Sequence, residues 1–277
     1  MPTVYIHPST KQQLENFAAH LPQSLLIAGP PGVGLKSSIS FIAETLHIKP
    51  IYIEPEKEDK VDLEKGIISV DIIRRLYDMT KTIETGTRFI VIDYAERMTI
   101  GAQNAYLKLL EEPGTNTHFA LLTHAVSRLL PTVRSRLQSL EMQPVTLKQS
   151  TDLLSELQVS DTQKQAQLLF IAAGLPALMV SLACNDKAFE ARAHIVRDAR
   201  TYLQGTVYER LKVSLKYKET RVDALAMLSD AGRLLESSIQ NGQSRDAIKK
   251  IDILLKTYER IEANGNVRLQ LASGVLQ

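Results

Sequence analysis

The feature that most constrains this chain is a glycine-rich turn between a predicted strand and a predicted helix. The strand is the apolar run SLLIAGP (Ser24–Pro30), and Ser37–Leu46 has the apolar spacing of a helix. A turn in this place can bind phosphate, because glycines let backbone N–H groups face the oxygens and the helix N-terminus adds its dipole. The turn reads GPPGVGLKSS, and its glycines are Gly29, Gly32 and Gly34. This context predicts a loop descended from a nucleotide site; a chance glycine turn before a helix is the alternative.

The loop departs from the hydrolytic pattern at its lysine. In G-x-x-x-x-G-K-S/T the lysine directly follows the second glycine. Counted from Gly29, that glycine is Gly34 and the next residue is Leu35, so that Lys36 and Ser37 come one position late. One step along a helix rotates a side chain by roughly 100°. We therefore expect Lys36 to point away from the site unless the loop bulges.

A second half of such a site is predicted in RFIVIDYAERM (Arg88–Met98). A strand ending at Asp93 would place this carboxylate to hold magnesium. Active ATPases of this type usually have an acid at the next position, which here is Tyr94, and Glu96 comes too late to be assumed equivalent. Because both the lysine and the acid are displaced, we expect a site that no longer hydrolyses nucleotide. An active ATPase with a bulged loop is the alternative.

Short apolar runs alternate with helical patterns through the first half of the chain, which predicts an α/β fold with a parallel sheet covered on both faces. Beyond about Val145 only helical patterns remain, with breaks at Gly205 and at Asn241-Gly242. The acidic stretch EKEDKVDLEK is predicted to be a solvated loop. The further strands are expected at Pro50–Pro55, Arg88–Asp93, His118–His124 and LQSLEM, and helices at Ile68–Ile83, Thr99–Glu112, Lys148–Gln158, Thr162–Ala173 and Pro176–Cys184.

Composition excludes several classes of protein. With 44% apolar and 23% charged residues, the 277-residue chain is not disordered. Its single cysteine, Cys184, excludes a disulfide framework and a thiolate zinc site, and we expect it to be buried on a helix. The net charge is only +2, without a dense basic stripe, so that any contact with DNA should be shared with partners. No membrane span or signal peptide is recognisable, and we expect a soluble cytoplasmic protein.

Three further segments resemble a known family. NAYLKLLEEPGTNTHFALLTHAVSRLLPTVRSRLQSLEM (Asn104–Met142) resembles the N-A-L-L-K-x-L-E-E-P helix, sensor strand and S-R-C corner of the clamp-loader subunits of bacterial DNA polymerase III. ISVDIIRRL (Ile68–Leu76) resembles their I-x-V-D-x-I-R-x-L helix, and the C-terminal NGNVRLQLASGVLQ resembles the end of their collar. The resemblance implies an AAA+ P-loop domain over residues 1–145, a small helical lid over 146–186 and an all-α collar, used for oligomerisation, over 187–277.

The set of motifs that this chain keeps and lacks is similar to that of one subunit type within this family. Motor subunits (γ or τ) keep the lysine, an Asp-Glu pair and S-R-C, whereas δ′ subunits keep S-R-C with a degenerate loop, and δ subunits lack S-R-C. This chain has Ser135-Arg136-Leu137 with a displaced lysine and no Asp-Glu pair, which resembles δ′. In addition, Pro176 stands near the position of the lid arginine that senses nucleotide in motor subunits.

The resemblance also implies roles for individual residues. Arg136, next to Ser135, would act in trans as an arginine finger on a neighbouring subunit's nucleotide, whereas Arg134 is expected to be structural or on the surface. Thr123 is expected to be packed in its strand. The helix residues Lys108, Glu111 and Glu112 are expected to face partners or solvent. The degenerate nucleotide site would consist of Gly29, Gly32, Gly34, Lys36, Ser37 and Asp93.

No cofactor is expected to be required, although residual binding of ATP or ADP is left open. No zinc is expected, because the four-cysteine module of many relatives is absent. The implied partners are the γ/τ motor subunits and the δ subunit, with the sliding clamp and primer–template DNA reached through the complex, and no membrane. The alternative function is an active AAA+ ATPase, either motor-like or a DNA repair or replication factor.

Overall fold

The computed structural model describes residues 4–63, 65–81, 86–240 and 245–276. It divides into two compact units, of which unit 1 comprises Met1–Asp161 and Ala172–Val180, and unit 2 comprises Thr162–Ile171 and Ser181–Gln277. The division falls within the helices α7 (Thr162–Ala172) and α8 (Pro176–Cys184). The three-part division at residues 145 and 186 stays a prediction.

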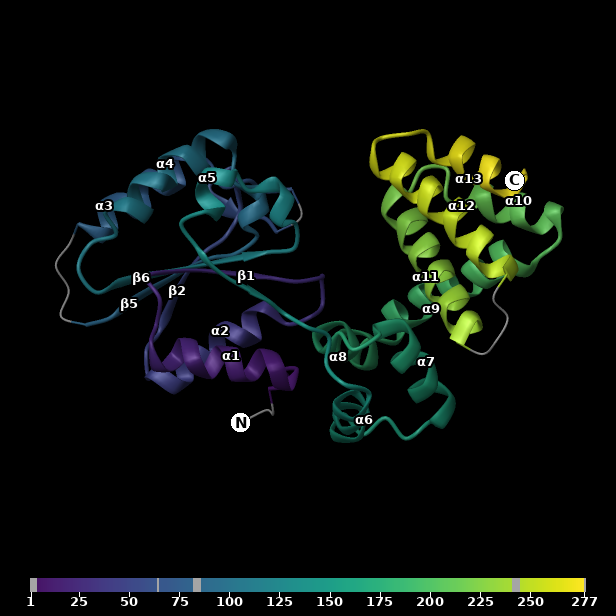
Figure 1. The fold of residues 1–277 in the computed structure, drawn as a ribbon, viewed down its shortest axis with the longest axis horizontal. Coiled ribbons are helices and arrows are strands. Elements are labelled where there is room, and N and C mark those ends of the chain that lie inside the picture. Colours follow the sequence, from purple (N-terminus) through teal and green to yellow (C-terminus); the bar gives the residue numbers. More distant parts are fainter. Residues whose placement is uncertain (1–3, 64, 82–85, 241–244, 277) are drawn as a thin grey trace. The chain divides into compact units, whose positions relative to one another are not determined.

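A five-stranded parallel sheet with the order β2-β5-β6-β1-β7 forms the centre of unit 1 (Figure 1). The central strands are buried on both faces, which explains why the sequence shows continuous apolar runs instead of alternation. The predicted parallel sheet is therefore confirmed. Its strands are β1 (Ser24–Ala28), β2 (Pro50–Ile53), β5 (Arg88–Ile92), β6 (Thr117–Thr123) and β7 (Gln138–Glu141).

Helices cover both faces of this sheet (Figure 1). Because successive strand side chains point to opposite faces, Leu26 packs with helices α3 and α4, whereas Leu25 and Ile27 pack with α1 and α2. The described part of unit 1 thus has two hydrophobic cores, one on each side of the sheet. Its helices are α1 (Pro8–Ala19), α2 (Leu35–Leu46), α3 (Val70–Thr80), α4 (Ile100–Glu111), α5 (Pro131–Arg134) and α6 (Leu147–Glu156), with short 3-10 turns η1 (Ala95–Arg97) and η2 (Val126–Arg128).

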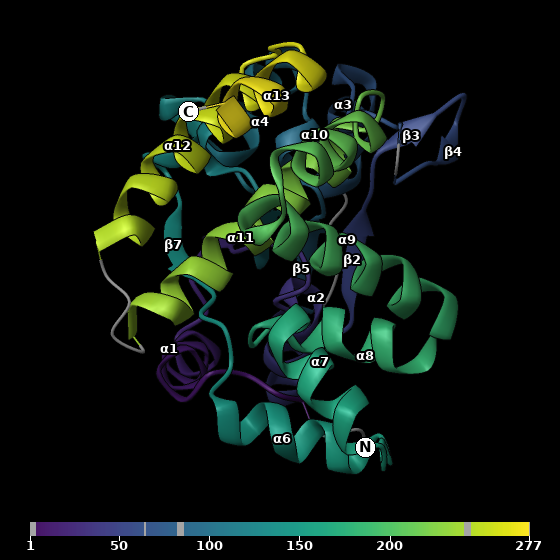
Figure 2. The ribbon, with the colours of Figure 1, turned by 90° about the vertical axis from the view of Figure 1, so that its right-hand side faces the viewer.

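Two parts of unit 1 differ from the sequence-based expectation. Helix α1 was not predicted. The acidic stretch expected to be a loop forms a hairpin of β3 (Glu56–Lys57) and β4 (Lys60–Val61), visible in Figure 2. Glu58 and Asp59 both have positive φ (52° and 59°), as in the two-residue turns whose twist matches that of paired strands. The predicted helix at 68–83 begins later, with Ser69 as its N-cap, and residues 82 and 83 lie outside the described residues.

The regular elements in the described part of unit 2 are all helices, as predicted for the region beyond residue 145 (Figure 2). Its helices pack around one core that includes Tyr202, Met227, Ile261 and Leu271. Gly205 ends one helix, and Thr206 then starts the next with a capping box. The predicted turn at Asn241-Gly242 lies outside the described residues. Besides parts of α7 and α8, the helices are α9 (Asp186–Gln204), α10 (Val207–Lys216), α11 (Arg221–Gln240), α12 (Arg245–Glu262) and α13 (Val267–Leu276).

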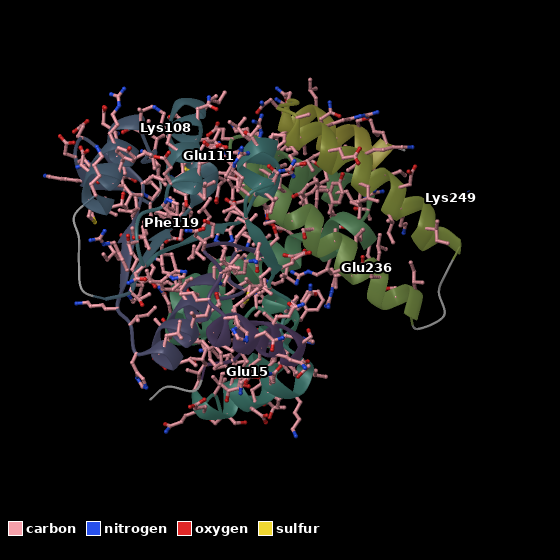
Figure 3. The ribbon with its side chains drawn as sticks, turned by 60° about the vertical axis from the view of Figure 1, so that its left-hand side comes forward. Glu15, Lys108, Glu111, Phe119, Glu236 and Lys249 are labelled. Atoms are coloured by element: carbon pink, nitrogen blue, oxygen red, sulfur yellow. The ribbon has the colours of Figure 1, made fainter. Side chains whose placement is uncertain are left out.

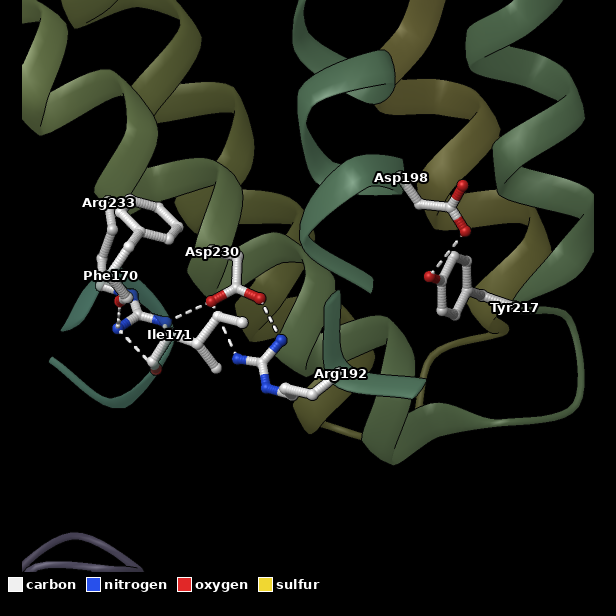
Figure 4. Close-up of polar contacts among 7 residues, drawn as sticks. All are labelled: Phe170, Ile171, Arg192, Asp198, Tyr217, Asp230 and Arg233. Carbon is white, nitrogen blue, oxygen red and sulfur yellow. Dashed lines mark hydrogen bonds and ion pairs between the residues drawn. The ribbon is translucent and has the colours of Figure 1, made fainter. Parts of the chain in front are cut away.

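A buried ion cluster links three helices in unit 2 (Figure 4). The carboxylate of Asp230 on α11 is fully buried and pairs with both Arg192 on α9 and Arg233. Arg233 also donates to the carbonyl oxygens of Phe170 (3.3 Å) and Ile171 (3.4 Å), near the end of α7. One aspartate therefore connects α9, α11 and, through Arg233, α7.

Cys184 is exposed at the end of α8, so the expectation that it is buried was wrong. Its position in the last turn explains the difference, because apolar packing of α8 ends with Leu182. Among the described helices, none combines the length and the apolar character needed to cross a membrane.

Candidate nucleotide site and exposed arginine

The predicted strand, glycine turn and helix are present in the structure. Gly32 and Gly34 have φ values of 89° and 95°, a backbone conformation that favours glycine. Gly34 is the N-cap of α2, and the helix begins directly at Leu35. The turn follows β1, so that it lies at the carboxyl edge of the parallel sheet, where such sheets commonly bind ligands.

The first turn of α8 packs directly on this loop. The carbonyl oxygen of Gly32 accepts a hydrogen bond from the N–H of Ala177 at 2.9 Å. A Cβ added at Gly32 would lie 2.7 Å from Cβ of Leu178, and one added at Gly34 would lie 4.0 Å from Cγ of Pro176. Pro176, predicted near the position of the sensor arginine, is thus beside the loop but contributes no positive charge.

The lysine position of the loop is occupied by the apolar residue Leu35, and the side chain of Lys36 does not point where the sequence predicts. Leu35 is buried in the core beneath α2 and cannot reach a phosphate. Nζ of Lys36 lies 2.7 Å from Oε1 of Glu54 and 2.9 Å from Oδ2 of Asp93. The expectation that Lys36 points away from the site was therefore wrong. Because α2 begins at Leu35, its regular geometry, and not a bulge, directs Lys36 to the carboxylate predicted to hold magnesium.

Asp93 and the residues after it form the second side of the site. The side chain of Asp93 is only 6% exposed, and its Oδ1 accepts a hydrogen bond from the N–H of Tyr94 at 3.0 Å. Tyr94, at the position of the catalytic acid, packs edge-on against the ring of His124, with centroids 5.8 Å apart. The carboxylate of Glu96 accepts from the N–H of His124 at 3.4 Å, so that it lies near the end of β6.

The other predicted residues of the site keep structural contacts. Ser37 lies against the loop, with Oγ 3.4 Å from the position of a Cβ on Gly34. Gly29 donates to the carbonyl oxygen of Thr123 at 3.2 Å and accepts from the ring of His124 at 2.8 Å. Thr123 is fully buried, in agreement with its predicted role in strand packing. The structure therefore brings all six predicted nucleotide-site residues to one edge of the sheet.

These residues do not fit a magnesium nucleotide bound as the resemblance implies. The glycine cradle is present, but a buried leucine stands at the lysine position and the magnesium aspartate is paired with an ammonium group. Oδ2 of Asp93 makes this contact as an ion pair, without a well-aligned hydrogen bond. Within the described ranges, no three His, Cys, Asp or Glu side chains are grouped to hold a metal ion.

Sequence reasoning missed Glu54, which completes the pair of carboxylates around Lys36. The register of the parallel strands β2 and β5 aligns Ile53 with Ile92, so that the residues that follow them, Glu54 and Asp93, are neighbours. The signal was an acid near the end of the strand predicted at Pro50–Pro55. Its neighbour could be known only from the strand order.

Arg136 lies apart from these residues, between α5 and β7. Its side chain is 41% exposed, with Nη1 donating to the carbonyl oxygen of Thr132 at 3.0 Å and Nη2 to Oε1 of Glu111 at 2.9 Å. Oγ of Ser135 donates to the same carbonyl group at 3.1 Å. Glu111 is on α4 together with Lys108, as Figure 3 shows. The expectation that Glu111 only faces partners or solvent missed this contact, which joins the LLEEP and Ser-Arg motifs.

Comparison with known proteins decides the family. A family model described as DNA polymerase III, delta subunit, matches residues 6–146, just over half of the chain. The chain belongs to this family. The resemblance to clamp-loader subunits of DNA polymerase III is thereby confirmed, and the matched segment contains the loop, Asp93 and Arg136.

Curated relatives of this family member include DNA polymerase III subunits delta′. The one from Haemophilus influenzae is 23% identical over 292 aligned positions, which cover 91% of this chain and 89% of the relative. The one from Bacillus subtilis is 37% identical over 121 residues, covering 43% of this chain and 36% of the relative. Replication factor C subunit 5 of Homo sapiens is 32% identical over 126 residues, which cover 44% of this chain and 36% of the relative. The chain thus matches about a third of the last two relatives.

Solved structures support the fold. A gamma subunit-related protein of DNA polymerase III from Thermotoga maritima has a TM-score of 0.51 and 19% identity, covering 96% of this chain and 97% of the other. The RuvB Holliday junction branch migration motor from Thermotoga maritima has a TM-score of 0.50 and 17% identity, and the match covers 81% of this chain and 76% of the other. The predicted fold class of this family member, an AAA+ P-loop domain followed by helices, is confirmed.

Proposed function

We propose that the chain is a non-hydrolysing, delta′-type subunit of the replicative clamp loader. It would scaffold the complex that loads the sliding clamp on primed DNA and supply Arg136 in trans to a neighbouring ATPase subunit. Family membership supports the clamp-loader part. The absence of hydrolysis and the role of Arg136 in trans are supported by one comparison within the chain. In its own loop, Leu35 is buried in the core and Lys36 is paired with Asp93, whereas Arg136 is exposed.

The setting of Arg136 supports a role toward another subunit. A planar guanidinium group can bind phosphoryl oxygens in a fork, and arginine fingers of this kind are worth roughly 10³–10⁵ in rate. Glu111, which pairs with Arg136, is itself half-exposed. A solvent-accessible ion pair of this kind contributes little to stability, so that the arginine can exchange Glu111 for a phosphate at low cost.

The test uses the complex reconstituted with γ/τ motor and δ subunits. With Arg136→Ala we expect assembly to be intact and clamp- and DNA-stimulated ATPase to fall, because the site that faces this subunit loses positive charge at the transition state. The fall should be partial when the motor subunits supply fingers to one another. Arg136→Lys should restore little of the ATPase rate, since an ammonium group lacks the fork geometry of a guanidinium group. Arg134→Ala is the matched control, because this exposed arginine lies only two residues earlier.

Two results would contradict the proposal. An unchanged ATPase rate of a complete complex with Arg136→Ala would reduce Arg136 to a structural residue and leave the chain a scaffold only. ATP turnover by the isolated chain that disappears with Lys36→Ala would instead support the alternative, an active AAA+ ATPase.

Assembly is proposed to depend on the helices after residue 186. Large apolar side chains are exposed there, among them Tyr208 and Val222, which are 75% and 79% exposed. We expect Tyr208→Asp or Val222→Asp to weaken co-elution with the partner subunits. Leu147→Asp is the control, because Leu147 is similarly exposed but belongs to unit 1. Equal co-elution of all three variants would contradict this role for the C-terminal helices.

A further inference from the structure

The closest charge contacts around the phosphate loop are those of Lys36. Its ammonium group lies within 2.9 Å of carboxylate oxygens from two neighbouring strand ends, Glu54 after β2 and Asp93 after β5. Asp93 is nearly buried, and one of its oxygens is already bound to the N–H of Tyr94. The other oxygen therefore depends on Lys36 for charge compensation.

The surroundings keep this ammonium group charged. Partial burial would lower the pKa of Lys36, but the contacts with Glu54 and Asp93 outweigh it and raise the pKa above its usual range. Lys36 also lies over the ring of Tyr52, 5.4 Å from its centroid, where a cation is favoured. Two carboxylates and one aromatic ring thus lie close to this cation, whose side chain is 49% exposed.

This cation stands where the loop pattern would place a metal ligand. In that pattern a Ser or Thr hydroxyl group follows the lysine and binds Mg²⁺, together with the aspartate at the end of the neighbouring strand. Here Leu35 has the lysine position and Lys36 the hydroxyl position. The chain therefore lacks one magnesium ligand and places a positive charge on another. A divalent ion at Asp93 would be repelled by the ammonium group.

We propose that Lys36 is a built-in cation that replaces the divalent metal ion at Asp93 and Glu54. The wild-type chain then has no divalent-cation site here, and removal of the ammonium group creates one. The inference deepens the proposed function, because it gives a physical reason for the loss of hydrolysis. It rests on that proposal only in treating the loop as descended from a nucleotide site. Its test measures metal binding, not turnover or assembly, so that either proposal can fail without the other.

The experiment follows thermal unfolding of the full chain with 0 to about 10 mM Mg²⁺ at constant ionic strength, and Mn²⁺ binding by electron paramagnetic resonance. Lys36→Ser supplies a hydroxyl group next to both carboxylates. We expect this variant to have a lower Tm without metal, and a Tm that rises by about 2–4 °C when Mg²⁺ reaches roughly ten times its Kd. Lys36→Ser combined with Asp93→Asn should lose this rise. We expect no Mg²⁺-dependent rise in Tm for the wild type or for Lys36→Arg. The control Lys11→Ser, which changes an exposed lysine, should show no rise either.

Either of two results would overturn the proposal. One is a Lys36→Ser chain whose Tm does not respond to Mg²⁺ and which binds no Mn²⁺. The other is a wild-type chain that binds one Mn²⁺ in the submillimolar range and loses it with Asp93→Asn. The second result does not require Lys36→Ser to fold, so that the proposal is open to refutation in either case.

Discussion

The same substitution, tyrosine to phenylalanine, should change stability in opposite directions at two buried positions. Tyr106 on α4 is fully buried, and its hydroxyl group has no hydrogen-bond partner among the described residues. Its ring packs edge-on against Phe119, with centroids 5.6 Å apart. Tyr202 on α9 is equally enclosed, but its hydroxyl group donates to the carbonyl oxygen of Leu271 at 2.8 Å. The two positions therefore differ in the hydrogen bond and not in burial.

The magnitudes follow from this difference. An unpaired buried hydroxyl group costs about 1–3 kcal/mol, of which Tyr106→Phe recovers part while losing the contacts of one oxygen atom. We expect Tyr106→Phe to raise the free energy of unfolding by about 1 kcal/mol. A made hydrogen bond contributes about 0.5–1.5 kcal/mol, so that Tyr202→Phe should lower it by about 1 kcal/mol. The family pattern quoted above has leucine at the position of Tyr106, in agreement with an apolar environment.

The assay is urea unfolding followed by circular dichroism at 222 nm, since the chain has no tryptophan for fluorescence. Hydrogen exchange of the amides of α4 and α9 assigns each change to its own unit, because Tyr106 is in unit 1 and Tyr202 in unit 2. Destabilisation by Tyr106→Phe of 1 kcal/mol or more, similar to that by Tyr202→Phe, would refute the reasoning. It would mean that the hydroxyl group of Tyr106 is hydrogen-bonded in the folded protein.

Three further changes test other contacts. Asp230→Ala should cost about 3–5 kcal/mol in urea unfolding, because it leaves two arginines beside a fully buried position; a loss below about 1 kcal/mol would contradict this. Burial raises the pKa of Tyr202 to about 12, so its contribution to stability is complete below pH 10 and falls by about 1.4 kcal/mol per pH unit from there to pH 12. An alkaline titration of Tyr202→Phe should show a shallower decline than wild type, and equal slopes would count against this assignment. Gly32→Ala should cost about 1–3 kcal/mol, because its φ is 89° and the new Cβ would meet Leu178 at 2.7 Å. Gly232→Ala, inside helix α11 with open space around it, is the control and should raise stability by about 0.5–1 kcal/mol. Equal effects of both glycine variants in thermal unfolding would be inconsistent with strain at the loop.

Several elements could be predicted from local pattern alone. The five sheet strands and the helices α2, α3 and α4 are each within a few residues of their predicted bounds, because a continuous apolar run or a helical spacing is a property of adjacent residues. The loop glycines, Asp93 and the Ser-Arg corner are likewise visible in sequence. The hairpin at Glu56–Val61 was missed, since its turn residues Glu58 and Asp59 are uncommon at positive φ.

The sequence by itself therefore determined the α/β class, the family and the displacement of the lysine by one position. Only the tertiary structure decided where the displaced lysine points and which groups it meets. Lys36, Glu54 and Asp93 come from three separate segments, and the strand order with β2 beside β5 brings them together. Glu111 and Arg136 meet in the same way across 25 residues. Such contacts depend on how distant segments pack, and no periodicity of neighbouring residues can encode that information.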